Sequence, residues 1–163
     1  MCRSRKGFTL VELAVVIVII GVLAAFGVPQ FLKSVERSKA AEAFNYLAAV
    51  RAAQERYLAK NGFYYSGTVG AGGVYSENED TGETLDINQN LPKYFDITGG
   101  ITEDHSTGGS PTWSCTLTRK ESSYGPYTVH FTQAGYDGST AEGTIGEFPD
   151  INPMGSDVMS SGG

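Results

Sequence analysis

The feature that most constrains this chain is a long apolar stretch near its start. From Leu13 to Val28 no residue is charged or strongly polar, and the apolar register extends from Phe8 to Phe31. That length meets the requirement of about 20 apolar residues for a helix that spans a membrane. Residues 1–7 contain three basic residues and no acidic one, which predicts that the N-terminus stays in the cytoplasm.

Glu12 stands near the head of this stretch and needs an explanation. An ionisable residue inside a spanning helix is costly and marks a functional position by default. A cleaved secretory signal should have an apolar region of roughly 7–15 residues that ends in a small-x-small site. Here the apolar run is longer, and no A-x-A triplet occurs in the first 30 residues. A plain membrane anchor explains the length and leaves Glu12 in water at the interface, but gives the carboxylate no role.

A helix that later enters the core of an assembly explains both Glu12 and the basic residues. A cut between Gly7 and Phe8 removes the basic leader and creates an ammonium at Phe8, four residues before Glu12. In a bundle of identical helices, the Glu12 carboxylate of one copy can pair with the Phe8 ammonium of a neighbour. Because a buried charge is tolerated only when it is paired, such a pair would set the stagger between subunits.

The residues KGFTLVEL, followed by an apolar helix and Pro29, resemble the signal and N-terminal helix of type IV pilins and type II secretion pseudopilins. The resemblance is dense from Lys6 to about Phe31 and weaker to about Lys60. It does not extend to the C-terminal disulfide loop common in pilins, since Cys115 is the only cysteine left after removal of the leader.

The resemblance implies an α+β fold, with a long N-terminal helix packed on a small antiparallel sheet. It also implies that a prepilin peptidase cuts after Gly7 and methylates the Phe8 amine, that Glu12 aids assembly, and that Pro29 marks a kink or a melted region. The implied partners are other copies of the chain in a helical filament, the peptidase and an inner-membrane assembly platform. The implied location is the bacterial inner membrane, with a periplasmic head, and then the filament.

The residues after Pro29 predict an amphipathic helix that stops at Asn61-Gly62. Pro29, with glycines at 21 and 27, marks a place where the helix could bend, so one continuous helix and two helices joined at Pro29 both remain open. The apolar positions at helical spacing are Val35, Ala40, Phe44, Leu47, Val50, Tyr57 and Leu58. The charged residues expected largely outside this face are Glu36, Arg37, Lys39, Glu42, Arg51, Glu55 and Arg56.

The remaining residues predict a β-rich head. Residues 62–82 are rich in small polar residues and predict a loop, and the glycine pair at 99–100 has loop surroundings. Alternating apolar residues in 111–119 and 127–132, joined by KESSYGP, predict an antiparallel hairpin with one face packed on the helix. The four β-prone runs are Thr84–Ile87, Tyr94–Thr98, Pro111–Arg119 and Tyr127–Thr132. The expected divisions are therefore a leader (1–7), a membrane and filament-core helix (8–30), an amphipathic helix (31–60) and a head with an acidic, glycine-rich tail (61–163).

The head is strongly acidic. Beyond Lys60 three basic residues face fourteen acidic ones, a balance of −11, which argues against nucleic acid as a partner. In the tail, Asp137, Glu142 and Asp150 either lie in solvated turns or hold a calcium ion, which takes six to eight oxygen ligands. The stretch has only a faint likeness to the calcium loop of major pseudopilins, and no EF-hand pattern exists. The sequence therefore indicates no definite cofactor, and calcium is the one candidate.

No catalytic motif is present. The two histidines, His105 and His130, have no metal-type partner at a recognisable spacing, and the chain contains no nucleophile elbow, phosphate loop or dinucleotide fingerprint. Cys115 is expected to be a small buried strand residue. The sequence thus predicts a non-enzymatic subunit that polymerises without covalent links into a type IV pilus or a type II secretion pseudopilus. The alternative is a monomeric membrane-anchored binding module that exposes an acidic β-rich head.

Overall fold

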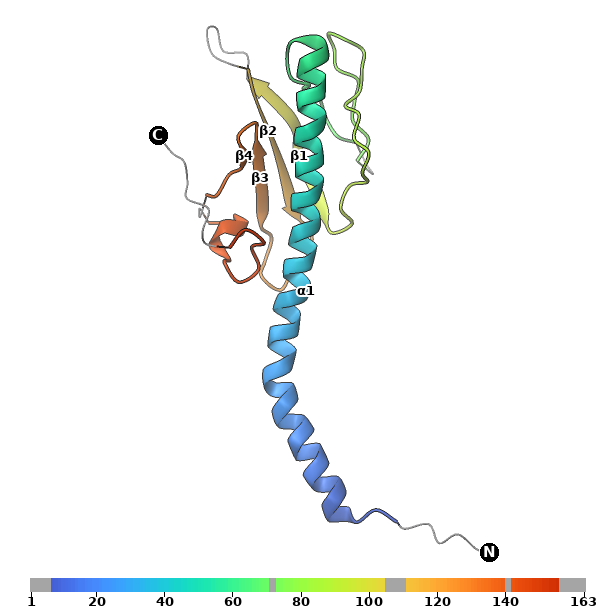
Figure 1. Cartoon of the computed structure of the whole chain (residues 1–163), viewed down its shortest axis with the longest axis vertical. Coiled ribbons are helices and arrows are strands. Elements are labelled where there is room, and N and C mark those ends of the chain that lie inside the picture. Colours follow the sequence, from blue (N-terminus) through green and yellow to red (C-terminus); the bar gives the residue numbers. More distant parts are fainter. Residues whose placement is uncertain (1–6, 71–72, 105–110, 140–141, 156–163) are drawn as a thin grey trace, which may run out of the picture. The chain divides into compact units, whose positions relative to one another are not determined.

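The computed structural model describes residues 7–70, 73–104, 111–139 and 142–155. The chain divides into two compact units, one ending at Val35 and one beginning at Glu36. A single long helix contributes to both, and the second unit adds a small sheet (Figure 1). The elements are α1 (Leu10–Asn61), β1 (Phe95–Asp104), β2 (Thr112–Arg119), β3 (Thr128–Thr132), β4 (Gly135–Tyr136) and the 3-10 turn η1 (Ile145–Glu147).

Helix α1 ends where the sequence predicts. Gly62 has a φ of 84° and donates its amide to the Leu58 carbonyl at 2.8 Å, which is the usual role of a glycine that follows a helix. Pro29 lies inside α1, which is assigned as one 52-residue helix. The continuous helix is therefore observed rather than two helices joined at Pro29. A bend or melting at Pro29 within a filament stays a prediction.

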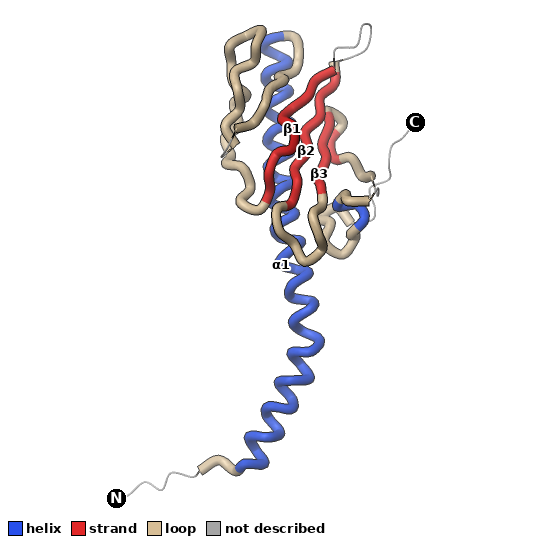
Figure 2. The backbone as a smooth tube through the Cα atoms, turned by 180° about the vertical axis from the view of Figure 1, so that it is seen from behind, coloured by secondary structure: helices blue, strands red, loops and turns tan. Residues whose placement is uncertain are grey.

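The sheet has the order β1-β2-β3-β4, and all its neighbours are antiparallel. Figure 2 shows β1, β2 and β3 side by side. Burial alternates along β2 and β3, so that Trp113, Cys115, Leu117, Val129 and Phe131 lie on the inner face. The predicted hairpin between residues 119 and 127 is confirmed by the pairing of β2 with β3, in which Thr118 faces Thr128.

The core lies between this inner face and the part of α1 that follows Val35. Leu47 and Val50 are fully buried, and the Phe44 ring meets the Phe131 ring edge-on with centroids 5.7 Å apart. Burying a side chain of this size contributes roughly 1.5–3 kcal/mol, so the apolar stripe of α1 is a main source of stability for the head. The predicted α+β fold, a long helix on an antiparallel sheet, is confirmed.

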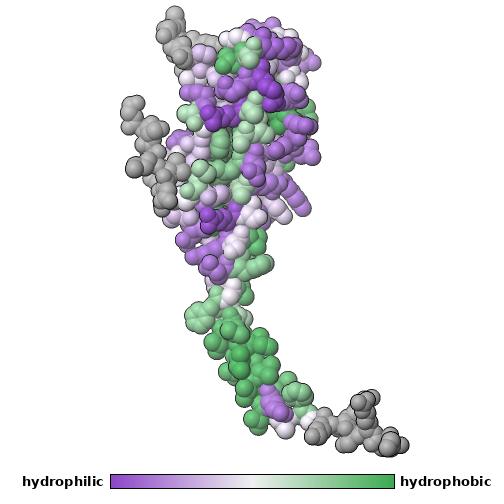
Figure 3. All heavy atoms as spheres, viewed as in Figure 1, coloured by the Kyte–Doolittle hydropathy of each residue, from purple (hydrophilic) through white to green (hydrophobic). Residues whose placement is uncertain are grey.

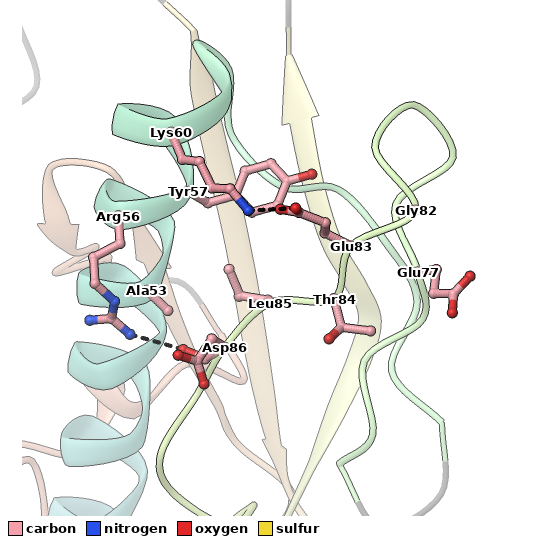
Figure 4. Close-up of a pocket in the computed structure, with 10 residues that line it drawn as sticks. All are labelled: Ala53, Arg56, Tyr57, Lys60, Glu77, Gly82, Glu83, Thr84, Leu85 and Asp86. Atoms are coloured by element: carbon pink, nitrogen blue, oxygen red, sulfur yellow. Dashed lines mark hydrogen bonds and ion pairs between the residues drawn. The ribbon is translucent and has the colours of Figure 1, made fainter.

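The predicted strand at Thr84–Ile87 is wrong. This segment has no ladder partner among the described residues and instead runs along α1 (Figure 4). Leu85 is buried, Arg56 Nη2 donates to the Asp86 carbonyl at 2.9 Å, and Lys60 Nζ lies 2.5 Å from Glu83 Oε1. Its β-prone pattern arises because one apolar residue faces the helix while its neighbours face water.

Strand β1 is longer than predicted, because the glycine pair at 99–100 lies inside it rather than in a loop. The register with β2 shifts between Thr98 and Ile101, and the two glycines have φ values of 78° and 80°, so they form a bulge. A Cβ on Gly100 would lie 2.4 Å from the Gly67 carbonyl oxygen. Glycine thus lets residue 67 approach and pair with Ile101 through two backbone bonds of 3.1 and 2.9 Å. Strand β4 and η1 were not predicted.

Candidate assembly site

Glu12 closes the N-terminus of α1 together with Thr9. The Glu12 carboxylate (Oε2) accepts the Thr9 amide at 2.9 Å and the Thr9 hydroxyl at 2.8 Å. The Glu12 amide in turn donates to the Thr9 hydroxyl oxygen at 3.2 Å. This reciprocal arrangement is a capping box, with Thr9 at N-cap and Glu12 three residues later. The capping box was not predicted, although the T-x-x-E spacing before an apolar run is a sequence signal for it.

Gly7 and Phe8 precede α1 in a segment without regular secondary structure. A side chain at residue 7 would meet no atom within 4 Å, and Phe8 is 82% exposed. Gly7 and Phe8 are therefore both exposed in the described part of the chain. The remainder of the expected leader, residues 1–6, lies outside the described residues.

The large side chains in the first half of α1 are exposed in the part of the chain that the structure describes. None of its most apolar 18-residue window is buried, and α1 is long and apolar enough to cross a membrane by length and composition (Figure 3). Every large apolar residue between positions 8 and 32 is exposed: Phe8, Leu10, Val11, Leu13, Val15, Val16, Ile17, Val18, Ile19, Ile20, Val22, Leu23, Phe26, Val28, Phe31 and Leu32. We call residues 8–32 the apolar segment. A surface this large and apolar requires either lipid or other helices.

Just after the apolar segment, Glu36 is buried, which corrects the expectation that it lies with the solvated charges. It is 5% exposed and pairs with Arg119 at the end of β2. Arg119 Nε donates to Glu36 Oε1 at 2.6 Å, and Nη2 donates to Oε2 at 3.1 Å. The Tyr127 hydroxyl donates to Oε1 at 3.0 Å, and Lys39 Nζ lies 3.5 Å from Oε2. No sequence signal joined residues 36 and 119, because the contact depends on the packing of helix on sheet.

The charge state of this pair follows from its surroundings. Burial alone would raise the pKa of Glu36, but the bonds from Arg119 and Tyr127 and the charges of Arg119 and Lys39 outweigh it, so the pKa lies below its ordinary value of 4.5. The bond to Glu36 raises the pKa of Arg119, and burial raises the pKa of Tyr127. Glu36 and Arg119 are therefore both ionised at neutral pH and lock the start of the head to the end of β2.

The three tail carboxylates considered for calcium do not converge in this structure. Asp137 Oδ1 accepts the Ser139 amide at 3.1 Å, and the side chains of Glu142 and Asp150 are exposed. Within the described residues, no group of three or more metal-type side chains could hold an ion. Calcium binding stays a prediction that rests on sequence alone.

Cys115 occupies the inner face of β2, as expected, and burial raises the pKa of its thiol to about 12. A thiol so protonated is a poor nucleophile. His130 Nδ1 lies 2.7 Å from the Thr116 hydroxyl on the outer face of the sheet. His105 lies outside the described residues.

Comparisons with known proteins place these features in a family context. A family model described as the prokaryotic N-terminal methylation motif matches residues 2–28, which include Gly7, Phe8 and Glu12. No solved structure matches the chain significantly.

Three curated relatives share the N-terminal part. The chain is 41% identical over 70 residues to fimbrial protein EcpC of Eikenella corrodens (43% of this chain, 46% of the relative). It is 44% identical over 60 residues to the type IV major pilin protein PilA of Myxococcus xanthus (37% and 27%). It is 41% identical over 64 residues to the type II secretion system core protein G of Pseudomonas aeruginosa (39% and 45%). The matches therefore span about a quarter to a half of these relatives.

The expected resemblance to the type IV pilin and type II secretion pseudopilin superfamily is thereby confirmed. The relatives carry the names of pilins and of a secretion-system core protein. None of the three is named as an enzyme, which agrees with the expectation of a non-enzymatic chain.

Proposed function

We propose that this chain, as a member of the pilin and pseudopilin superfamily, is a prepilin-type structural subunit of a helical filament assembled from the inner membrane. The observation that carries the proposal is the apolar segment, whose large side chains are all exposed and which follows an exposed Gly7. The subunit is anchored by this segment before assembly, with its N-terminus in the cytoplasm and its head in the periplasm. In the filament the same segment packs against copies of itself.

Assembly depends on a charge that processing creates. A prepilin peptidase removes residues 1–7 and methylates the Phe8 amine, which leaves a cation next to the capping box. Lipid is as apolar as the helices, so burial alone gives little preference for the filament, and packing and polar pairing must decide it. In the single chain the Glu12 carboxylate is held by Thr9. In the filament the Phe8 ammonium of a neighbouring copy supplies the charge that neutralises it.

Relatives of two kinds support the two machines that could use such a subunit. EcpC and PilA are named as a fimbrial protein and a pilin, and core protein G belongs to a secretion system. Both a type IV pilus and a type II secretion pseudopilus therefore remain within the proposal. An inner-membrane assembly platform is the further partner in either machine.

The experiment is intact-mass analysis of the chain purified from bacteria that contain a prepilin peptidase. We expect a mature protein that begins at a methylated Phe8. Gly7→Val is the control, because it should block cleavage and leave the full leader in place. Filaments whose subunits keep Met1 would overturn the proposal. A wild-type chain that keeps its leader and stays monomeric would also overturn it, in favour of an anchored binding module.

A further inference from the structure

Two of the three basic residues beyond Lys60 lie against one exposed aromatic ring, and the backbone of the third bonds to the same residue. Beyond Lys60 the only cations are Lys93, Arg119 and Lys120. The Lys93 Nζ and Arg119 Cζ atoms lie 5.6 and 5.3 Å from the centre of the Tyr94 ring, and the Lys120 amide donates to the Tyr94 carbonyl at 3.0 Å.

Helix α1 adds a fourth cation to this place. Lys39 Nζ lies 4.7 Å from the centre of the Tyr94 ring. We call Lys39, Lys93, Arg119 and Lys120 with Tyr94 the basic cluster. Tyr94 is 37% exposed, so the ring has cations around it and one side open to water.

The basic cluster stays positive after its own ion pairs are counted. Glu36 neutralises Arg119 and also contacts Lys39, and Asp96 Oδ1 lies 2.7 Å from Lys120 Nζ. Two carboxylates thus face four cations, and Lys93 is exposed. Glu121, the next residue along the chain, carries the nearest further negative charge in sequence. The contrast is sharp with a head whose overall balance beyond Lys60 is −11.

The position of the basic cluster along the chain indicates its partner. Lys39 comes eight residues after Phe31, where the apolar register ends. At 1.5 Å per helical residue this is at most about 12 Å along the helix, a few ångströms beyond a headgroup layer of about 5–8 Å, and a long lysine side chain can cover that remaining distance. Tyrosine and lysine are the residue types that anchor proteins at this depth, since a ring or an apolar stem lies among the lipids while the polar end stays wet.

We propose that the three lysines of the basic cluster, which are accessible where Arg119 is buried, bind anionic phospholipid headgroups of the membrane that holds the apolar segment. The inference rests on the proposed function in one respect, namely that the apolar segment is embedded in a bilayer. Its physical reason is charge: an anionic lipid surface repels the acidic residues of the head and attracts the basic cluster. Each cation near such a surface contributes about 1 kcal/mol. The contact holds the waiting subunit at the membrane and is released when the subunit leaves the lipid.

The test is lysine footprinting of the full chain in vesicles. The protein is reconstituted at high dilution in pure phosphatidylcholine or in an equal mixture of phosphatidylcholine and phosphatidylglycerol, and acetylation rates are read by mass spectrometry. We expect Lys93 to react about fivefold more slowly in the anionic vesicles, the factor equivalent to the ~1 kcal/mol above. Lys60 is the internal control, because it is exposed and pairs with Glu83 rather than with the cluster, and its rate should not change. Added salt should remove the difference.

Matched variants make the result specific. Lys120→Gln should reduce the protection of Lys93, whereas Arg56→Gln, on the solvated face of α1, should leave it unchanged. Equal Lys93 rates in the two lipids would overturn the inference. The inference would also be overturned if Lys93 were equally protected from acetylation in both lipids and this protection rose with protein density. The basic cluster would then bind the acidic surface of a second copy. A chain that alkaline carbonate extracts from both vesicles would instead contradict the proposed function, so the two failures are distinguishable.

Discussion

Glu36 and Arg119 form a two-bonded ion pair across 83 positions of sequence, with both side chains buried. Glu36 is the first residue of the head unit, and Arg119 ends β2. The pair therefore ties the point where the helix enters the head to the central hairpin. Bidentate geometry and the extra bond from Tyr127 satisfy the carboxylate that burial would otherwise penalise.

Loss of one partner should be costly. Arg119→Met leaves the Glu36 charge buried and unpaired, and we expect it to lower the free energy of unfolding by about 3–5 kcal/mol. Lys120→Met breaks only the exposed pair with Asp96 and should cost at most about 1 kcal/mol. Urea unfolding of the full chain in detergent, followed by the fluorescence of the single tryptophan, Trp113, measures both. Equal losses in the two variants would contradict the role of the pair.

Acid should weaken the same interaction. The pKa of Glu36 is lowered in the folded state, so the stabilisation is complete above its ordinary value of 4.5 and is lost as the pH falls through the lower folded value. We expect the free energy of unfolding to decline in that window. The double variant Glu36→Leu/Arg119→Met lacks the pair and should show a shallower decline. A wild-type curve that rises towards acid, or parallels that of the double variant, would rule this out.

The two roles of Glu12 can be separated. Glu12→Ala removes both the cap and the charge, and we expect it to abolish filaments or slow their formation severely. Thr9→Val disrupts the capping box but keeps the carboxylate, so it should cost about 1 kcal/mol of local helix stability while filaments still form. Filament yield after shearing, with electron microscopy, is the measurement. If Thr9→Val were as damaging as Glu12→Ala, capping rather than charge pairing would explain the carboxylate.

The bulge in β1 predicts a difference between adjacent glycines. Gly99→Ala and Gly100→Ala both place a side chain at positive φ, which costs roughly 1–2 kcal/mol each. Only at Gly100 would the new Cβ also collide with the Gly67 carbonyl, and Gly99 meets nothing within 4 Å. We therefore expect Gly100→Ala to be the more destabilising in urea unfolding. If Gly99→Ala were the more destabilising variant, the backbone at residue 67 would have to move away from a new Cβ at residue 100 at little cost.

The acidic residues of the tail allow a direct test of calcium binding. If Asp137, Glu142 and Asp150 gather around an ion, chelation of calcium should lower the melting temperature of the head, because an ion that binds only the folded state stabilises it. Asp150→Asn should abolish the effect of chelation, and Asp86→Asn should not. Identical melting temperatures with and without chelator would end this hypothesis.

Local sequence patterns were sufficient to predict much of the secondary structure of this chain. The length and composition of the apolar segment, the stop at Asn61-Gly62 and the alternating hairpin were all readable because each depends on neighbours within a few positions. The same kind of pattern was misleading at Thr84–Ile87, where one buried leucine beside polar residues fits a strand as well as an extended segment held by helix side chains.

The sequence by itself determined the membrane-length helix and the two apolar faces that meet in the head, because apolar side chains must leave water wherever the chain places them. Only the tertiary structure decided that Glu36 is buried, that residues 99–100 bulge to admit residue 67, and that three cations meet at the Tyr94 ring. These contacts join residues far apart in sequence. Their energies exist only once packing has brought the partners together and removed the water between them.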